Sequence, residues 1–207
     1  DAITTGNNST AVGYNALSAD TGGLNVGIGY TAGAAVSTGT RNTAVGPAAL
    51  DAATTGNDNT AIGANALGAA TTSSSNTAIG SYALQLCTTG TENTAVGYTA
   101  LDAVTTASSN TAVGHNALTA STAADNTAVG RHALYANTTG TNNAAVGLNS
   151  LAANTTGGTN TAVGRSALAA NTTASENTAV GAYAADANTT GASNTAVGYA
   201  SLSENTT

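Results

Sequence analysis

The chain has 207 residues, of which 41% are apolar, 6% are charged and 3% are aromatic. An average globular domain is about 25% charged, so this is not an ordinary globular domain. Three basic residues against ten carboxylates exclude a basic nucleic-acid-binding surface. No run approaches the ~20 apolar residues of a membrane-spanning helix, and the single cysteine, Cys87, excludes a disulfide framework. We therefore expect neither nucleic acid binding nor membrane insertion.

A five-residue phrase, Asn-Thr-Ala-Val-Gly or a close variant, recurs along the chain every 17 residues, with two spacings of 16. Its closing glycines are Gly13, Gly29, Gly46, Gly63, Gly80, Gly97, Gly114, Gly130, Gly147, Gly164, Gly181 and Gly198. No linker or change of composition separates the copies, so we expect residues 1–207 to form a single repeat domain.

The length of the repeat indicates the fold. Seventeen residues are too few for the two helices of a helical repeat, which need about 30 or more, and the abundant Thr, Val, Asn and Gly disfavour helix. We predict an all-β fold, a parallel β-solenoid or β-roll of about twelve coils stacked about 4.8 Å apart. In each coil the first strand is expected at Asn-Thr-Ala-Val-Gly and a turn at the next two, variable positions. A second strand is expected through Ala-Leu-x-Ala-x-Thr-Thr, followed by a turn at Gly-x-x.

Columns of nearly fixed identity predict the interior of the solenoid. The residue before each glycine is Val or Ile, and the fourth residue after it is Leu in most copies, so we expect both columns to face inward. The predicted core consists of Val45, Ile62, Ile79, Val96, Val113, Val129, Leu50, Leu67, Leu84, Leu101 and Leu118. Within the second strand, Ala and Thr at steps of two from Leu are expected to face inward as well.

Polar columns predict ladders, in which each side chain bonds its copy in the next coil. These residues are Asn42, Asn59, Asn76, Asn93, Thr54, Thr71, Thr88 and Thr105. Even with ladders, one buried Val and one buried Leu per coil, at about 1.5–3 kcal/mol each, leave a thin margin against the roughly 25 kcal/mol cost of ordering 17 residues. Association of several chains would bury a second face, so we predict a homo-oligomer. The chain begins and ends within a coil, which predicts a segment of a longer fibre or a subunit that stacks end to end into a filament.

The segment Asn42-Thr43-Ala44-Val45-Gly46, followed by Ala49-Leu50 and Thr54-Thr55-Gly56, resembles a repeat of fibrous proteins. It is similar to the left-handed parallel β-roll repeat of trimeric autotransporter adhesin heads, whose unit is a few residues shorter, and to repeat arrays of phage and viral tail-fibre proteins. The resemblance covers essentially the whole chain. It implies an elongated homotrimeric rod, extracellular or on a cell or virion surface, with no catalytic residues.

The sequence offers no convincing catalytic, cofactor or metal site. His115 and His132 lie in neighbouring coils but in different columns, with no column of Asp, Glu or Cys beside them. Cys87 has no histidine in phase with it. Aspartates that share a column lie three or more coils apart, which argues against a repeated calcium site. We predict a protein that is not an enzyme and holds no cofactor or metal.

Six of the seven tyrosines fall on the two turn positions after the glycine. They are Tyr14, Tyr30, Tyr98, Tyr199, Tyr82 and Tyr183. Together with nearby Arg and His, they are candidates for contact with a partner, either a cell-surface or glycan target of an adhesin head or another subunit.

Two further features leave alternatives open. Thr-Thr pairs, such as Thr54-Thr55, resemble the threonine ranks of ice-binding solenoids, although adjacent residues of a strand face opposite sides. Asn-Thr-Thr sequons matter only if the host glycosylates this protein. The sequons of this type begin at Asn137, Asn154, Asn171, Asn188 and Asn205. The favoured hypothesis is a structural rod of an extracellular or virion fibre, with adhesin and ice-binding functions as alternatives.

Overall fold

The computed structural model describes residues 8–206, which form two compact units that divide between Ser108 and Ser109. Unit 1 contains β1 (Thr10–Val12), β2 (Val26–Ile28), β3 (Thr43–Val45), β4 (Thr60–Ile62), β5 (Thr77–Ile79) and β6 (Thr94–Val96). Unit 2 contains β7 (Thr111–Val113), β8 (Thr127–Val129), β9 (Ala144–Val146), β10 (Thr161–Val163), β11 (Thr178–Val180) and β12 (Thr195–Val197). The described residues form no helix. The predicted all-β parallel solenoid is confirmed.

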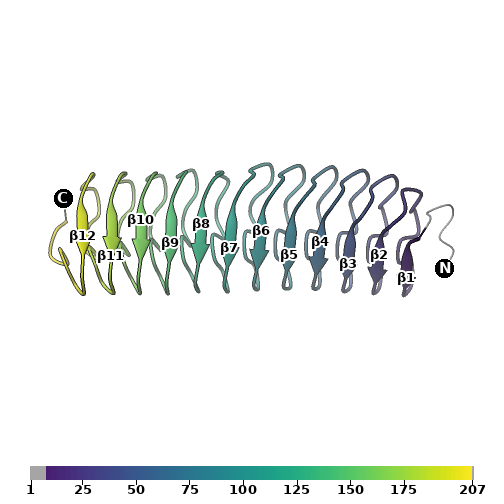
Figure 1. Ribbon diagram of the computed structural model, residues 1–207, viewed down its shortest axis with the longest axis horizontal. Helices are drawn as coiled ribbons and strands as arrows, with labels where there is room; N and C mark the ends of the chain where they lie inside the picture. The colour runs from purple at the N-terminus through teal and green to yellow at the C-terminus, as the bar shows by residue number, and fades with distance from the viewer. Residues whose placement is uncertain (1–7, 207) are drawn as a thin grey trace. The chain divides into compact units, whose positions relative to one another are not determined.

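Each strand belongs to one coil, and within each unit the strands stack in sequence order (Figure 1). The register is one residue to one: Ala61 of β4 pairs with Ala44 of β3 and Ala78 of β5, and Ala145 of β9 pairs with Ala128 and Ala162. Identical side chains therefore lie above one another, which explains why columns of the sequence keep one residue type.

The turn that ends each strand requires glycine. Gly46 has φ +127°, and a Cβ placed there would lie 2.8 Å from the carbonyl oxygen of Gly63 in the next coil. An L side chain would meet both backbone strain and a clash with stacked backbone. The glycine column is thus fixed by the coil spacing.

The predicted second strand is wrong: the segment from Ala-Leu to Thr-Thr forms turns. In the coil of β4, Asn65 and Leu67 both have left-handed φ values, 54° and 52°. Two such residues bend the chain twice within three positions, which a pleated strand does not allow. The segment still bonds to the next coil, since the Leu67 amide donates to the carbonyl of Ala83 at 2.9 Å. Left-handed Leu costs about 1–2 kcal/mol, and its full burial offsets this cost.

The inward assignment of the Val and Ile column is also wrong. In each strand the middle residue faces the interior, and the first and third residues face outward; Ala44 and Ala61 are buried, whereas Val45 is half-buried and Ile62 is 38% exposed. The same holds for the other predicted members, Ile79, Val96, Val113 and Val129, which are exposed or half-buried.

Val and Ile face outward, and Ala inward, because the coil is narrow. The leucine column fills the space opposite the middle strand position. At Gly27, which takes the place of that alanine in β2, a Cβ would lie 2.7 Å from Cγ of Leu17 and 2.9 Å from the carbonyl oxygen of Ala32. Even a methyl group would press on its neighbours there, so a branched side chain does not fit opposite leucine. In most other coils, alanine fills the strand side of the interior and leucine the opposite side. The predicted leucines Leu50, Leu67, Leu84, Leu101 and Leu118 are fully buried, as expected.

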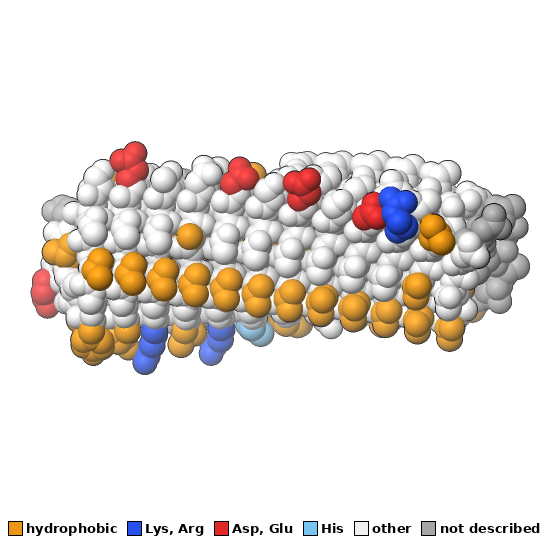
Figure 2. Space-filling view, in the orientation of Figure 1, with side chains coloured by type: hydrophobic (Ala, Val, Ile, Leu, Met, Phe, Trp, Pro, Cys, Tyr) orange, Lys and Arg blue, Asp and Glu red, His pale blue; other side chains and the backbone are white. Residues whose placement is uncertain are grey.

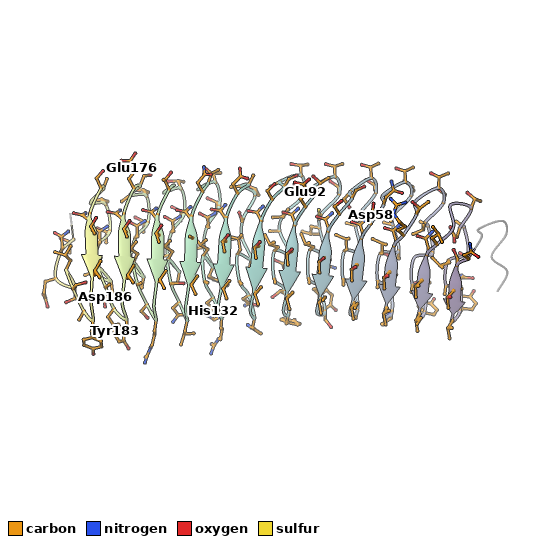
Figure 3. All side chains as sticks on the ribbon, viewed as in Figure 1. Asp58, Glu92, His132, Glu176, Tyr183 and Asp186 are labelled. Carbon is orange, nitrogen blue, oxygen red and sulfur yellow. The ribbon has the colours of Figure 1, made fainter. Side chains whose placement is uncertain are left out.

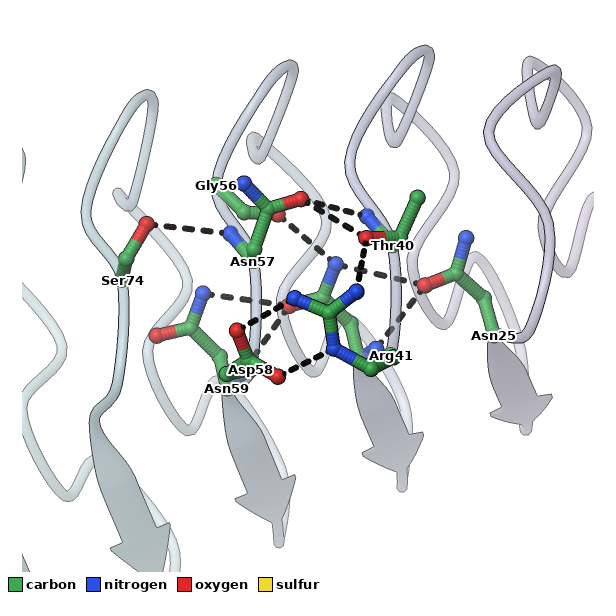
Figure 4. A network of polar contacts seen from close by, with 9 residues as sticks. Asn25, Thr40, Arg41, Gly56, Asn57, Asp58, Asn59 and Ser74 are labelled. Atoms are coloured by element: carbon green, nitrogen blue, oxygen red, sulfur yellow. Dashed lines mark hydrogen bonds and ion pairs between the residues drawn. The ribbon is translucent and has the colours of Figure 1, made fainter.

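The predicted asparagine ladder is present in the interior. Nδ2 of Asn59 donates to Oδ1 of Asn42 at 3.1 Å (Figure 4). It also donates to the carbonyl of Ser73 at 2.8 Å, and Oδ1 of Asn59 accepts from Nδ2 of Asn76 at 3.2 Å. Asn93 extends the ladder through its backbone amide, which donates to Oδ1 of Asn76 at 2.9 Å. These bonds satisfy buried amides and fix the register between coils.

The threonine ladder differs from the prediction in its acceptor. Oγ1 of Thr54 donates to the backbone carbonyl of Thr71 at 3.0 Å, not to a threonine hydroxyl, and Thr71 and Thr88 repeat the contact with Thr88 and Thr105. The inward orientation expected for this column is wrong, because Thr54, Thr71 and Thr105 are exposed. These threonines lie on the outer side of a bend. Their side chains face solvent, and the hydroxyls of Thr54 and Thr71 each donate a hydrogen bond to a backbone carbonyl of the next coil.

Candidate functional site

Surfaces, and not cavities, carry the chemistry of this protein. Residues 8–206 enclose no pocket, and within that range no three His, Cys, Asp or Glu side chains lie close enough to hold a metal ion. None of these residues forms a helix of the length and hydrophobicity needed to cross a bilayer. Three surfaces differ in composition: the outer face of the strands and the two edges where the chain turns.

The first surface is the outer face of the strands, termed here the Thr–Val face, formed by the first and third residue of each strand. Figure 2 shows its apolar side chains as a stripe with one member per coil. The third-position residues that are at least 37% exposed are Val12, Ile28, Ile62, Ile79, Val146, Val163, Val180 and Val197. The first position is Thr in most strands, and neither position carries a charge. Each unit thus exposes a regular, uncharged column of β-branched side chains.

The second surface is the turn edge, formed by the two residues after each glycine. Here the predicted tyrosines come together in pairs from neighbouring coils. The rings of Tyr14 and Tyr30 stack with centroids 5.5 Å apart, and those of Tyr82 and Tyr98 meet edge to face at 6.0 Å. In unit 2, Tyr183 and Tyr199 also meet edge to face, at 6.1 Å.

In unit 2 the turn edge also carries histidine and arginine (Figure 3). The rings of His115 and His132 are 5.9 Å apart, and the guanidinium of Arg165 lies 5.2 Å from the centre of the Tyr183 ring. Tyr135, which the sequence pattern left outside the tyrosine group, lies with its ring 5.1 Å from that of His132. It stands three residues further along the coil, and the left-handed turns between them bring the two rings together.

The environment of His132 lowers the pKa of its imidazole. Desolvation is the largest cause, followed by the positive charges of Arg131 and His115, while a hydrogen bond with Asn149 acts in the opposite direction. The basic groups of this edge therefore lie close enough to repel one another.

The third surface, termed the acidic edge, is formed around the position five residues before each glycine. Here Nε and Nη2 of Arg41 donate to the two carboxylate oxygens of Asp58 at 2.6 and 2.7 Å (Figure 4). This pair lowers the pKa of the Asp58 carboxyl through the hydrogen bond. Glu92 and Glu176 occupy the same position in their coils and are exposed (Figure 3). The acidic edge lies across the coil from the turn edge.

Individual residues that the sequence singled out have structural roles. Cys87 is fully buried, and burial raises the pKa of its thiol to about 11, so the thiolate needed for nucleophilic chemistry is disfavoured. Asp51 and Asp102 are half-buried, and desolvation raises the pKa of each carboxyl; they lie three coils apart. The sequon asparagines Asn137, Asn154, Asn171 and Asn188 are fully buried, which closes them to glycosylation in the folded protein.

Both residues of a Thr-Thr pair are exposed, contrary to the expectation from strand alternation. Thr54 and Thr55 face solvent because the segment is not a strand. A regular column of outward-facing threonines does exist on the sheet, at the first position of the strands. Thr43 and Thr60, for example, belong to it and pair in register.

Comparison with known proteins adds no relative: no protein-family model, no curated protein and no solved structure matches this chain.

Proposed function

We propose that this chain is a non-enzymatic structural segment of a fibre outside the cell or on a virion, in which copies of the chain cover one another's Thr–Val face. The observation that carries the proposal is the exposed Val and Ile column. Large contiguous apolar surfaces on soluble proteins mark interaction sites. A column that places one β-branched side chain on every coil, in register, suits a partner with the same repeat, and the partner with that repeat is a second copy.

The energies support association over a long column. Covering the exposed part of a Val or Ile in this column recovers about 1 kcal/mol, and each unit presents six such positions. Two copies that cover each other along one unit therefore gain roughly 12 kcal/mol, within the range of about 4–15 kcal/mol that association costs. A few coils would not suffice, so the length of the repeat array is itself part of the mechanism. The resemblance to adhesin heads favours three chains in the assembly.

Register-locked coils supply the mechanical property that a fibre needs. Each coil is tied to the next by backbone bonds and by the Asn and Thr ladders. Such local, repeated bonding resists unfolding from any one point. The Thr–Val face then sets the assembly, and the two edges remain outside it.

Mass in solution tests the proposal, with two matched variants. Val129→Asp/Val163→Asp places charges on the Thr–Val face of unit 2, whereas Ala162→Asp places one charge at the buried neighbour of Val163. We expect the native chain to sediment as an oligomer. The double variant, which keeps only the face of unit 1, should dissociate to the 19.6 kDa of one chain at concentrations where the native chain stays assembled, with its β circular dichroism intact. Ala162→Asp should instead lose structure, because a carboxylate would be buried without a partner.

Two results would contradict the proposal: a native chain that stays at single-chain mass at all concentrations, or a double variant that assembles like the native protein. Immunogold labelling of the source material provides a separate check of the location, since the fibre hypothesis requires label outside cells or on virions.

The same face favours ice binding as a second candidate function. Outward Thr and Val or Ile ranks recur at the parallel strand spacing of about 4.8 Å, close to the repeat of oxygen positions along hexagonal ice, and no charge interrupts them. Thermal hysteresis measured on the same samples separates the two functions. A monomer with hysteresis that Val129→Asp/Val163→Asp abolishes supports ice binding, whereas an oligomer without hysteresis supports the fibre.

A further inference from the structure

Unit 2 gathers its basic side chains on one edge. All four of its basic or imidazole side chains lie on the turn edge: His115, Arg131, His132 and Arg165. Two of its carboxylates, Asp125 and Glu176, lie on the acidic edge, and no carboxylate of residues 109–206 occupies a turn-edge position. The remaining acids are Asp186, which borders the turn edge beside Tyr183 at the coil position that Tyr135 holds (Figure 3), and Glu204 near the end of the unit.

The arginines of this edge have no carboxylate to neutralise them. Within residues 8–206 the ion pair of the protein is Arg41–Asp58, in unit 1. Arg131 and Arg165 are exposed, and after desolvation, the largest cause, repulsion from Arg131 and His115 also lowers the pKa of His132. An anion bound along this edge would relieve that repulsion, and arginine is the side chain best suited to hold a carboxylate through two parallel hydrogen bonds.

Aromatic rings lie among these charges. Tyr135 contacts His132, and Tyr183 lies between Arg165 and the exposed ring of Tyr199. An exposed tyrosine offers an apolar face together with a hydroxyl. That combination matches a sugar ring, which presents C–H groups on one face and hydroxyls at its rim, and it does not match a simple anion.

The spacing of the arginines indicates a low density of negative charge on the ligand. Arg131 follows β8 and Arg165 follows β10, two coils apart, or roughly 9.6 Å at the parallel strand spacing. This is close to the length of one extended disaccharide. Duplex DNA, by contrast, carries one charge per about 1.7 Å, far more than two arginines would match. We propose that the turn edge of unit 2 binds an acidic polysaccharide that carries a carboxylate on every second sugar, with Arg131 and Arg165 on the carboxylates and Tyr135, Tyr183 and Tyr199 against the sugar rings.

The test uses the full chain and three probes: hyaluronan, which has this charge pattern, neutral dextran, and single-stranded DNA. Affinity electrophoresis in gels that contain each probe gives the affinities. We expect hyaluronan, but not dextran, to retard the native chain. Arg131→Gln/Arg165→Gln should weaken the binding at least ten-fold, and Tyr183→Ala/Tyr199→Ala several-fold. Because these side chains are on the surface, circular dichroism should be unchanged.

Arg41→Gln is the matched control, since it removes the third arginine of the chain from the acidic edge of unit 1. It should leave hyaluronan binding intact. The proposal is overturned if hyaluronan does not retard the native chain, if the double arginine variant binds like the native chain, if Arg41→Gln weakens binding as much, or if DNA binds as tightly as hyaluronan. The turn edge and the Thr–Val face are different surfaces, so a mass measurement on the same samples judges the fibre proposal separately.

Discussion

The two units share the strand, the buried leucine and the first asparagine ladder, but they fill one interior column differently. The column lies seven residues after the glycine. In unit 1 it is apolar from the second coil onward, and the side chains are Val36, Ala53, Ala70, Cys87 and Val104. In unit 2 it is polar, with Ser121, Asn137, Asn154, Asn171 and Asn188. All ten are buried, so one backbone supports two kinds of interior.

The polar version works because Asn137, Asn154 and Asn171 each find partners in the coils on both sides. Nδ2 of Asn154 donates to Oδ1 of Asn137 at 2.8 Å and to the carbonyl of Gly157 at 2.9 Å, and its Oδ1 accepts from Asn171 at 3.0 Å. In unit 1, Sγ of Cys87 has a single long contact, 3.6 Å to the carbonyl of Gly90. A buried column can therefore be apolar or amide, but an amide requires hydrogen-bonding neighbours in the adjacent coils.

The largest expected effect follows from breaking the amide column. Asn154→Val places in unit 2 the residue type that unit 1 holds at positions 36 and 104. It removes the donor to Oδ1 of Asn137 and the acceptor of one Nδ2 proton of Asn171, whereas the carbonyl of Gly157 keeps its bond from Asn143. Each buried polar group left unpaired costs about 1–3 kcal/mol. We expect a loss of about 4 kcal/mol in the free energy of unfolding, measured by denaturant titration. Hydrogen exchange should show the loss within unit 2.

A tolerated Asn154→Val would mean that the amide ladder adds nothing beyond packing. Val104→Ala in unit 1 is the control for a volume change in the same column. It should cost less than Asn154→Val, because it leaves no polar group unpaired.

The converse substitution gives a smaller effect. Cys87→Asn places an amide in the apolar column of unit 1. Its Nδ2 should reach the carbonyl of Gly90, as Asn137 reaches that of Gly140 at 2.9 Å. Its Oδ1, however, would face Ala70 and Val104, which donate nothing, so we expect a loss of about 1–3 kcal/mol. A melting temperature equal to or above that of the native chain would contradict the requirement for hydrogen-bonding neighbours.

The native Cys87 offers a simple companion measurement. Because the thiol is buried and its pKa is raised to about 11, we expect no reaction with a thiol reagent at pH 7.5 until denaturant unfolds unit 1. Rapid labelling of the folded chain would show that this column opens more readily than the rest of the interior. The onset of labelling during a denaturant titration reports the stability of unit 1 separately from unit 2.

The fold was predictable because the same residue type recurs at the same position of each repeat. Such a column indicates that successive coils stack with identical side chains above one another. Which side chains of each strand face the interior was not predictable. Alternation in Thr-Ala-Val separates Ala from Thr and Val but does not say which set faces inward, and that depends on a coil too narrow for Val opposite Leu. The turn conformation of Leu67 could not be predicted either, since a left-handed leucine has no sequence signal and is imposed by the closure of the coil.

The candidate site was predictable in part for a related reason. The turn-edge tyrosines share a column, so the pattern grouped them, but Tyr135 joins His132 only through the turns between their positions. The second amide ladder, the interior asparagine column of unit 2, appears in the sequence as the repeated segment Asn-Thr-Thr. That segment is also a glycosylation sequon, which was the more obvious interpretation. Asn137 and its copies could have been recognised by position, since they fall in the column that holds Ala and Val in unit 1.

The smallest effect we predict separates the two turn edges by pH. Histidine occurs on the turn edge of unit 2 and not in unit 1. His132 faces Arg131, His115, Tyr135 and Asn149, and its pKa lies below the usual value, about 6.5 for an unperturbed imidazole. At pH 7.5 the imidazole is neutral, and it gains a proton only as the pH falls below this usual value.

A bound carboxylate would favour the protonated form of His132, so binding and proton uptake should be linked. We expect hyaluronan affinity to rise about two- to five-fold between pH 7.5 and 5.5, since one or two exposed charges contribute up to about 1 kcal/mol. Sugar carboxylates, like the α-carboxyl with its pKa near 3.5, stay ionised over that range. His115→Gln/His132→Gln should bind with an affinity that does not vary with pH. A rise that persists in this variant would place the titrating group elsewhere and remove histidine from the binding edge.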